Sequence, residues 1–179
     1  MSPRHHRSAW AEGEVKIMPD DGWYGVAAPN ERILEFLHIF SRFEYALKVT
    51  GFLEGDENDP RAAWDCFARD VLREFQAARK RDEQFQAAVN YLLANPPKKL
   101  IRQRDGLIWK LVQPEQGVSD SENVLKMVRR VRNNLFHGGK YLPDTTADVD
   151  RDRQVIDHSL IILHKCVALR SNVHGAYRK

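Results

Sequence analysis

SDSENVLKMVRRVRNNLFHGG, at residues 119–139, is the part of the sequence that most strongly indicates the fold. It opens on Ser119-Asp120-Ser121-Glu122, which matches a capping box, a pattern in which two side chains satisfy free backbone amides at a helix start. Apolar residues then follow at steps of four, three and four, the spacing of one helix face: Val124, Val128, Val131 and Leu135. We expect this helix to end near His137, because the next residues are glycines, which readily adopt the left-handed conformation that closes helices.

Helical spacing recurs upstream in two segments. The first, residues 31–53, carries an apolar stripe of Phe36, Phe40, Phe43 and Leu47. Asp59-Pro60 predicts the start of the second, since aspartate caps helices and proline suits their first turn. Its stripe consists of Trp64, Phe67, Val71 and Phe75. The charged run at residues 79–82 bends this helix or ends it.

Two further helices and one hairpin complete the expected fold. Asn95-Pro96-Pro97 must stop the first of these helices, because proline breaks helical hydrogen bonding, and its stripe is Phe85, Val89 and Leu92. The last helix has the stripe Ile156, Leu160, Leu163 and Val167. Within residues 98–112, Asp105-Gly106 separates two β-rich runs and predicts a hairpin, the only sheet expected. The fold class is therefore all-α, a helical bundle of four to five helices with a small inserted β-hairpin.

The length and composition predict one helical domain. The chain has 179 residues, of which 42% are hydrophobic, enough to bury a single core. Residues 1–29 show no helical or strand period and form an irregular arm, residues 30–173 form the domain, and residues 174–179 form a tail. No run approaches the roughly 18 apolar residues of a membrane span, and no apolar run follows the basic N-terminus as in a secretory signal. We expect a cytoplasmic protein without membrane partners.

Two cysteines, Cys66 and Cys166, have no neighbour at metal-ligand spacing. The sequence therefore gives no support for a zinc site or a disulfide framework, and we expect neither metal nor cofactor.

The charge is unevenly distributed along the chain. Residues 98–140 hold ten Lys or Arg and four Asp or Glu, a net +6 in a chain whose formal net charge is +3. Such a stretch suits a polyanionic partner, although a solvated helix face plus a charged hairpin would give the same count.

Arg132 and His137 are the candidate catalytic pair. The guanidinium of arginine presents a fixed fork of N–H donors that matches the oxygens of a phosphate. Histidine gives or takes a proton near neutral pH. Together they supply what metal-free cleavage of an RNA phosphodiester requires. The spacing alone does not select them, because arginine precedes histidine by five to seven positions in five pairs: Arg32/His38, Arg130/His137, Arg132/His137, Arg151/His158 and Arg153/His158. The amide of Asn133, the helix-ending glycines and the surrounding basic stretch favour Arg132/His137.

The segment from Arg132 to Lys140, RNNLFHGGK, resembles the signature of the HEPN superfamily, in which an arginine, a polar residue and a histidine follow one another at this spacing. Residues 42–48, RFEYALK, also resemble the first-helix segment of some bacterial members. The resemblance implies a helical bundle, a homodimer and metal-independent endoribonuclease activity. Many members are toxins of toxin–antitoxin pairs or act in phage defence, which implies a cognate antitoxin protein as a further partner. Other members bind RNA or proteins without catalysis.

Five more residues receive roles from their positions. Asn133 orients a phosphate or holds one member of the pair, and the resemblance implies that Glu44 pairs with Arg132 and fixes its fork. Arg129 and Lys140 are expected to bind RNA phosphates, and Tyr141 to stack on a base. Ordinary surface positions remain the alternative for each of them.

Helix geometry gives a separate reason to expect a homodimer. Five residues along a helix correspond to about 140° of rotation and about 7.5 Å of rise, so Arg132 and His137 of one chain diverge unless the helix ends first. A two-fold axis beside the helix end would bring both pairs into one cleft, with Leu135 or Phe136 at the contact. Two alternatives to the endoribonuclease stay open: a non-catalytic RNA-binding or protein-interaction module, and a structural subunit of a defence complex.

Overall fold

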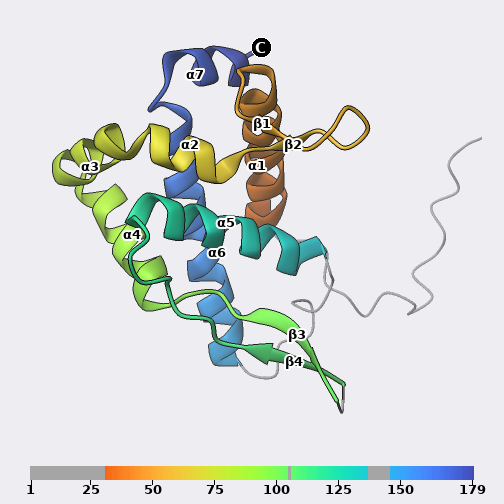
Figure 1. Cartoon of the computed structure of the whole chain (residues 1–179). Coiled ribbons are helices and arrows are strands. Elements are labelled where there is room, and N and C mark those ends of the chain that lie inside the picture. The colour runs from red at the N-terminus through yellow and green to blue at the C-terminus, as the bar shows by residue number, and fades with distance from the viewer. Residues whose placement is uncertain (1–30, 105, 137–145) are drawn as a thin grey trace, which may run out of the picture.

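A computed structural model describes residues 31–104, 106–136 and 146–179, with side chains described from residue 150 in the last range. The expected arm at residues 1–29 lies outside this description. Helices dominate the fold, as the sequence predicts, and two small antiparallel hairpins accompany them (Figure 1). In chain order the elements are α1 (Glu31–Val49), β1 (Leu53–Glu54), β2 (Arg61–Ala62), α2 (Trp64–Asp70), α3 (Leu72–Arg81), α4 (Glu83–Ala94), β3 (Lys99–Gln103), β4 (Gly106–Lys110), α5 (Asp120–Phe136), α6 (Thr146–Val167) and α7 (Ser171–Tyr177).

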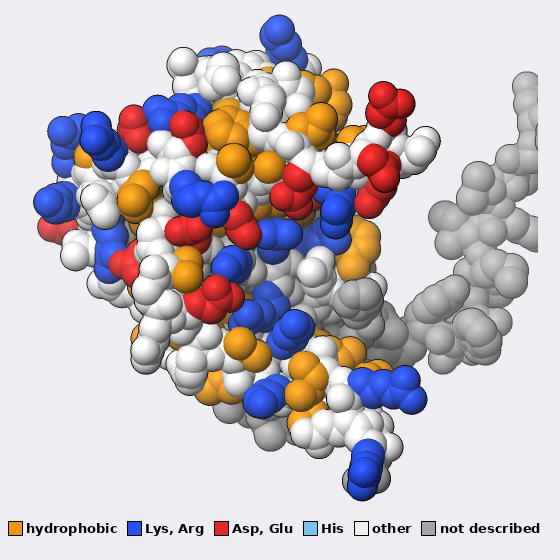
Figure 2. Space-filling model, viewed as in Figure 1, with side chains coloured by type: hydrophobic (Ala, Val, Ile, Leu, Met, Phe, Trp, Pro, Cys, Tyr) orange, Lys and Arg blue, Asp and Glu red, His pale blue; other side chains and the backbone are white. Residues whose placement is uncertain are grey.

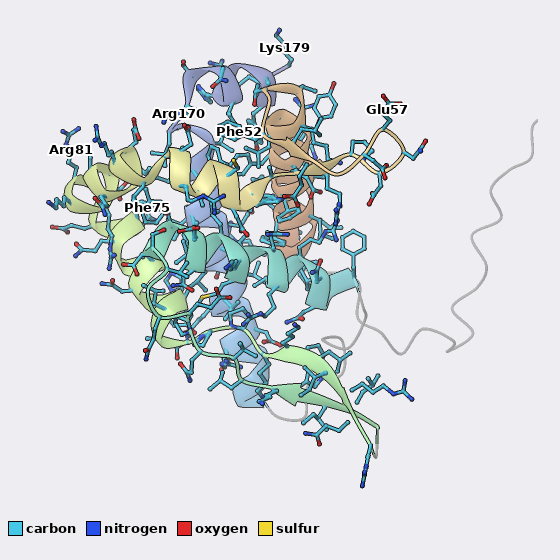
Figure 3. All side chains as sticks on the ribbon, in the orientation of Figure 1. Phe52, Glu57, Phe75, Arg81, Arg170 and Lys179 are labelled. Atoms are coloured by element: carbon cyan, nitrogen blue, oxygen red, sulfur yellow. The ribbon has the colours of Figure 1, made fainter. Side chains whose placement is uncertain are left out.

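The core forms where the predicted apolar stripes meet. Every residue of the five stripes is buried, and α6 packs along both α1 and α4. Aromatic rings connect the helices: Phe43 of α1 meets the edge of Phe67 of α2 at 5.3 Å between ring centroids, and Phe75 of α3 meets Phe85 of α4 at 5.0 Å. Figure 3 shows Phe75 on the inner side of the α3–α4 corner. The stripes therefore form one continuous core.

The predicted second helix is divided into α2 and α3 at Val71, and the charged run at residues 79–82 ends α3. Asp82 closes α3 and caps α4, since its side chain accepts the backbone N–H of Phe85 at 2.9 Å. The same carboxylate forms an ion pair with Lys165 of α6. Contact with Lys165 and the backbone N–H of Phe85 lowers the pKa of Asp82. The α3–α4 corner is thereby tied to the long helix behind it.

The helix start predicted at Asp59-Pro60 is wrong. The second helix begins at Trp64, and residues 59 and 60 belong to the loop between β1 and β2, a second small sheet that the sequence did not indicate. Asp56 organises this loop, because its Oδ1 accepts the backbone N–H groups of Asn58 and Asp59 at 2.9 Å each. Gly55 has φ +93°, and a Cβ there would lie 2.2 Å from the Asp59 carbonyl oxygen. The Asp56 side chain therefore forms an Asx-type turn at the place where the sequence predicts a helix cap.

The hairpin predicted at residues 98–112 is present as β3 and β4. The strands pair from Lys99 opposite Lys110 to Gln103 opposite Gly106, and Figure 1 shows the hairpin extending away from the helices. Its base is fixed to α5 by the buried Asn134, whose amide donates to the Lys98 carbonyl at 2.7 Å. The base of the hairpin is thus attached to the same helix that carries Arg132.

The C-terminal stretch contains a further helix. Residues 174–179, which the sequence suggested as a tail, include most of α7. Val173 is fully buried, and Arg42 of α1 donates to the Tyr177 carbonyl at 2.6 Å. The helix therefore packs against α1 and belongs to the domain. Across the parts of the chain that the structure describes, no helix is both long and apolar enough to cross a bilayer.

Candidate functional site

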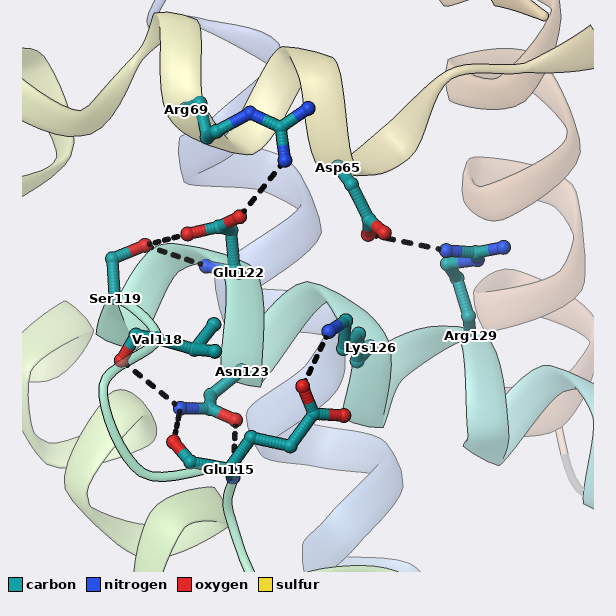
Figure 4. Close-up of polar contacts among 9 residues, drawn as sticks. All are labelled: Asp65, Arg69, Glu115, Val118, Ser119, Glu122, Asn123, Lys126 and Arg129. Atoms are coloured by element: carbon teal, nitrogen blue, oxygen red, sulfur yellow. Dashed lines mark hydrogen bonds and ion pairs between the residues drawn. The ribbon is translucent and has the colours of Figure 1, made fainter.

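Helix α5 carries the candidate site on residues outside its buried apolar stripe. Its start is capped as predicted: the Ser119 hydroxyl accepts the N–H of Glu122 at 3.3 Å and donates to its carboxylate at 2.8 Å (Figure 4). The Ser119 hydroxyl, together with Arg69 at 3.1 Å, lowers the pKa of Glu122. An ionised carboxylate at a helix N-terminus is favourable. The helix is therefore anchored at its start, and its other end presents Arg132.

Of the predicted site residues that the structure describes, Arg132 is the most constrained. Its Nη1 donates to the Asn133 side-chain oxygen at 3.0 Å, and its Nη2 lies 3.8 Å from the Glu44 carboxylate. The guanidinium also lies over two aromatic rings, 5.5 Å from the Phe40 centroid and 4.9 Å from the Phe136 centroid. Rings at this distance attract a cation. Because the side chain is still 36% exposed, donors of the oriented fork remain accessible to a ligand.

Glu44 lies where the sequence analysis expected it, opposite Arg132. It projects from α1, and the indole Nε1–H of Trp64 on α2 donates to its Oε1 at 3.4 Å. Trp64 is buried and stacks on Phe40 at 5.0 Å between centroids. The contact between Glu44 and Arg132 is confirmed, while its part in an activity stays a prediction. Three helices, α1, α2 and α5, thus meet around one arginine.

Asn133 and Arg129 have partners of different kinds. Asn133 is exposed, and its side chain accepts from Arg132, which corresponds to the expectation that it holds one member of the pair. Arg129 lies 3.4 Å from Asp65 of α2 (Figure 4). Its positive charge is therefore partly offset, and a phosphate would have to compete with Asp65 for it.

Three of the four other arginines at the same spacing make contacts within the fold. Arg130 donates to the Pro97 and Val112 carbonyls at 3.1 and 3.3 Å, and burial lowers its pKa. Arg151 donates to the Pro96 carbonyl at 2.9 Å, and Arg32 pairs with Glu35 and Asp157.

Of the alternative histidines, His158 packs its ring on Tyr91 at 4.2 Å between centroids. Burial lowers the pKa of His158. His38 is exposed on α1, and its arginine partner at this spacing, Arg32, is already engaged in ion pairs. The contacts of Arg32, Arg130 and Arg151 and the packing of His158 favour Arg132 over these three arginines, whereas Arg153 is exposed and has no described ion pair.

Three predicted site residues, His137, Lys140 and Tyr141, lie outside the described residues. Two residues that the sequence analysis did not assign to the site, Phe40 and Trp64, contribute to it. Phe40 precedes Glu44 by four positions on a predicted helix, so the two share a face, and that spacing was the available signal. No comparable signal pointed to the indole of Trp64.

A basic hollow lies between α5 and the β3–β4 hairpin. Lys99 and Leu100 of β3 line one side, and α5 lines the other with Lys126, Arg129, Arg130, Asn133 and Asn134. Figure 2 shows Lys and Arg side chains over α5 and along the hairpin. Lys126 pairs with Glu115 at 2.8 Å, a contact that raises the pKa of the lysine. The hollow starts beside Arg132, since Asn133 borders it and also accepts from Arg132.

Within residues 31–104, 106–136 and 146–179, no three His, Cys, Asp or Glu side chains gather closely enough to hold a metal ion. Both cysteines are free: Cys66 is exposed, and burial raises the pKa of Cys166 to about 12. A thiol of such high pKa is a poor nucleophile. The described part of the site therefore offers an oriented guanidinium beside a basic hollow as its reactive feature.

The chain matches no protein-family model, no curated protein and no solved structure. The resemblance to the HEPN superfamily accordingly depends on residues 132–140 and 42–48. Arg132 and Glu44, one from each of these two segments, are in contact in the structure.

Proposed function

We propose that the protein is a HEPN-type endoribonuclease that cuts RNA without a metal ion. The observation that carries the proposal is the arrangement of Arg132, whose fork is oriented by Glu44, Asn133 and two rings and is still accessible. Arginine in such a position matches the charge and geometry of a phosphodiester. A fork that is oriented before RNA binds needs little reorganisation when charge develops on the phosphate.

In the proposed reaction the ribose 2′-oxygen bonds to phosphorus while the bond from phosphorus to the 5′-oxygen breaks. The 2′-hydroxyl loses its proton, the departing 5′-oxygen gains one, and the products end in a 2′,3′-cyclic phosphate and a 5′-hydroxyl. His137 acts as general acid or base in these transfers. Arg132 stabilises the charge that grows on the phosphate. Single-stranded or loop RNA is the substrate, because its backbone is free to adopt the in-line geometry.

A homodimer completes the proposed site. Leu135 is buried in the core of its own chain, whereas Phe136 is 66% exposed. Of the two residues expected at the contact, Phe136 is therefore the one available to a second copy. Its ring covers one side of the Arg132 guanidinium, so a contact there would lie directly beside the catalytic pair. We propose that two Arg132 side chains share one groove in the cytoplasmic dimer.

As biological role we propose a toxin of a toxin–antitoxin pair or an effector of phage defence, with a cognate antitoxin as protein partner. The runner-up is a HEPN-type module that binds RNA without cutting it. The basic hollow supports this second reading, because the described residues that line it could hold phosphates without any proton transfer.

Incubation of the purified protein with single-stranded RNA in EDTA tests the proposal. We expect cleavage, with fragments that carry 2′,3′-cyclic phosphate ends. Activity that is lost in EDTA and restored by magnesium would exclude this mechanism. Binding of the RNA without any cleavage would favour the non-catalytic module.

A further inference from the structure

The β3–β4 hairpin carries a group of positive charges that no described acidic side chain compensates. Four of its basic side chains are exposed, and none of the four forms an ion pair with another residue that the structure describes: Lys99, Arg102, Arg104 and Lys110. Lys126 and Arg129, the cations on the neighbouring surface of α5, already contact Glu115 and Asp65. An anionic ligand would therefore meet free cations on the hairpin first.

The register of the hairpin brings two of these cations together. Lys99 and Lys110 are directly opposite each other on the paired strands. Like charges in this position repel, and they destabilise a two-stranded sheet. No carboxylate in the described structure pairs with either of them. An anion that binds between the two ammonium groups would remove the repulsion, which the fold itself does not offset.

The hairpin is continuous with the candidate site. Lys99 borders the basic hollow on the hairpin side, and Asn133 borders it on the α5 side, where it is bonded to Arg132. In Figure 2 the Lys and Arg side chains run from α5 to the tip of the hairpin. Each strand has five residues, about 16 Å at a rise of about 3.3 Å per residue. One polyanionic strand would follow this path from the hairpin to Arg132.

We propose that the β3–β4 hairpin is an RNA-binding arm that holds the phosphates of the substrate strand next to those at Arg132. The proposal rests on the RNA-directed function proposed above and adds the surface that binds the strand outside the site of cleavage. Charge decides between an RNA and a protein as occupant. The exposed Leu107 and Ile108 could contact a protein. The four cations without an ion pair, however, are complementary to a ligand with closely spaced negative charges.

The experiment compares two variants of equal charge. In the hairpin variant, Lys99, Arg102, Arg104 and Lys110 are replaced by alanine. In the control variant, four other exposed cations without a described ion pair are replaced by alanine: Arg73, Lys80, Arg81 and Lys179. Each variant lowers the formal net charge of +3 by four. Figure 3 labels Arg81 and Lys179, which lie at the ends of the molecule away from the hairpin.

The probe is a fluorescent single-stranded RNA with 2′-O-methyl groups throughout, which lacks the attacking hydroxyl and stays intact. Its binding is measured by anisotropy between about 50 and 200 mM salt, where each phosphate contact with a single strand contributes about 0.7 to the slope of log affinity against log salt. We expect the hairpin variant to bind about tenfold more weakly or worse, with a slope smaller by up to about 3. The control variant should bind like the parent protein.

Photocrosslinking of the parent protein to a probe that contains 4-thiouridine gives a readout that does not depend on the folding of any variant. Crosslinks at residues 98–112 are expected, and their absence would overturn the proposal, as would equal binding by the two variants or a parent that binds no RNA. If the parent binds the probe through the hairpin but does not cut unmodified RNA, the proposed cleavage fails and the RNA-binding arm stands. If the parent cuts RNA and the hairpin variant binds and cuts equally well, the arm fails and the cleavage stands.

Discussion

Replacing Glu44 by glutamine tests whether this carboxylate positions Arg132. The carboxylate lies 3.8 Å from Arg132 Nη2 and accepts the Trp64 indole N–H at 3.4 Å. Glutamine keeps the length of the side chain and an oxygen for Trp64, and it removes only the negative charge. The variant therefore isolates the ion pair from the packing around it.

The loss of folding stability in this variant should be small. Two unit charges 3.8 Å apart attract each other by about 4 kcal/mol at an effective dielectric constant near 20. Both side chains are partly exposed, at 36% and 27%, so screening and side-chain ordering reduce the net contribution to about 0–1 kcal/mol. For a chain of this size the melting temperature then falls by about 4 °C at most.

The effect on RNA cleavage should be larger than the effect on stability. Without Glu44, Arg132 keeps its charge and its two rings but loses one of the contacts that orient its fork. Complete loss of a phosphate-stabilising donor costs about 10²–10³ in rate, so a misaligned donor should cost about tenfold in kcat, which corresponds to about 1.4 kcal/mol. RNA binding should stay equal or become tighter, because a negative charge has left the neighbourhood of the phosphate.

The assay is cleavage of a fluorescent RNA in EDTA, with kcat and KM determined separately. Glu35→Gln is the matched control, because Glu35 lies on the same helix and pairs with Arg32 at 2.8 Å in an exposed position. It should cleave like the parent protein. A Glu44→Gln variant with the kcat of the parent would refute the positioning role, and so would a loss confined to KM.

Three further predictions concern assembly, pH and stability. Phe136→Ser should turn a micromolar dimer into a monomer in light scattering, since the ring is 66% exposed in one chain; a monomeric parent would contradict this. Because burial lowers the pKa of His158 from its ordinary 6.5, the unfolded chain takes up the proton first and stability is lost as pH falls below about 6.5. His158→Phe should reduce that loss in thermal melts, and an unchanged pH dependence would count against it. Asn134→Ala removes the hydrogen bond to the Lys98 carbonyl and should cost about 0.5–1.5 kcal/mol in urea unfolding, so an unshifted midpoint would show the contact to be dispensable.

Much of the fold follows from the spacing of apolar residues. The stripes on α1, α4, α5 and α6 are buried as predicted, because a helix with one apolar face packs that face against the core and away from water. The Ser119 cap also forms as expected, since capping depends on residues within one helical turn. These features are local, so one sequence suffices to predict them.

The features that were missed depend on competition or on distant contacts. Asp59-Pro60 matches the pattern of a helix start. In the structure, however, the Asp56 side chain accepts the backbone N–H groups of Asn58 and Asp59 and forms a turn. Helix α7 has seven residues, too few for a clear stripe, and it is held by packing of Val173 and by Arg42.

The candidate site was predictable in part. Arg132 follows from its place at the end of an amphipathic helix, and its contact with Glu44 follows from the resemblance of residues 42–48. The contribution of Trp64 depends on how α2 crosses α1, and one sequence does not specify that crossing. The bonds that engage Arg130 and Arg151 with backbone carbonyls are likewise tertiary, so spacing alone left these arginines as rivals.

The most direct test of the central claim is RNA cleavage in EDTA by Arg132→Ala, His137→Ala and the control His158→Ala. Loss of the proton-transfer group should lower the rate by about 10²–10⁴, and loss of the phosphate-stabilising group by about 10²–10³. His158, which packs on Tyr91, should be dispensable for cleavage. The account predicts that both pair variants fold and fail to cut RNA while His158→Ala cuts like the parent protein. Full activity in His137→Ala or Arg132→Ala would contradict it.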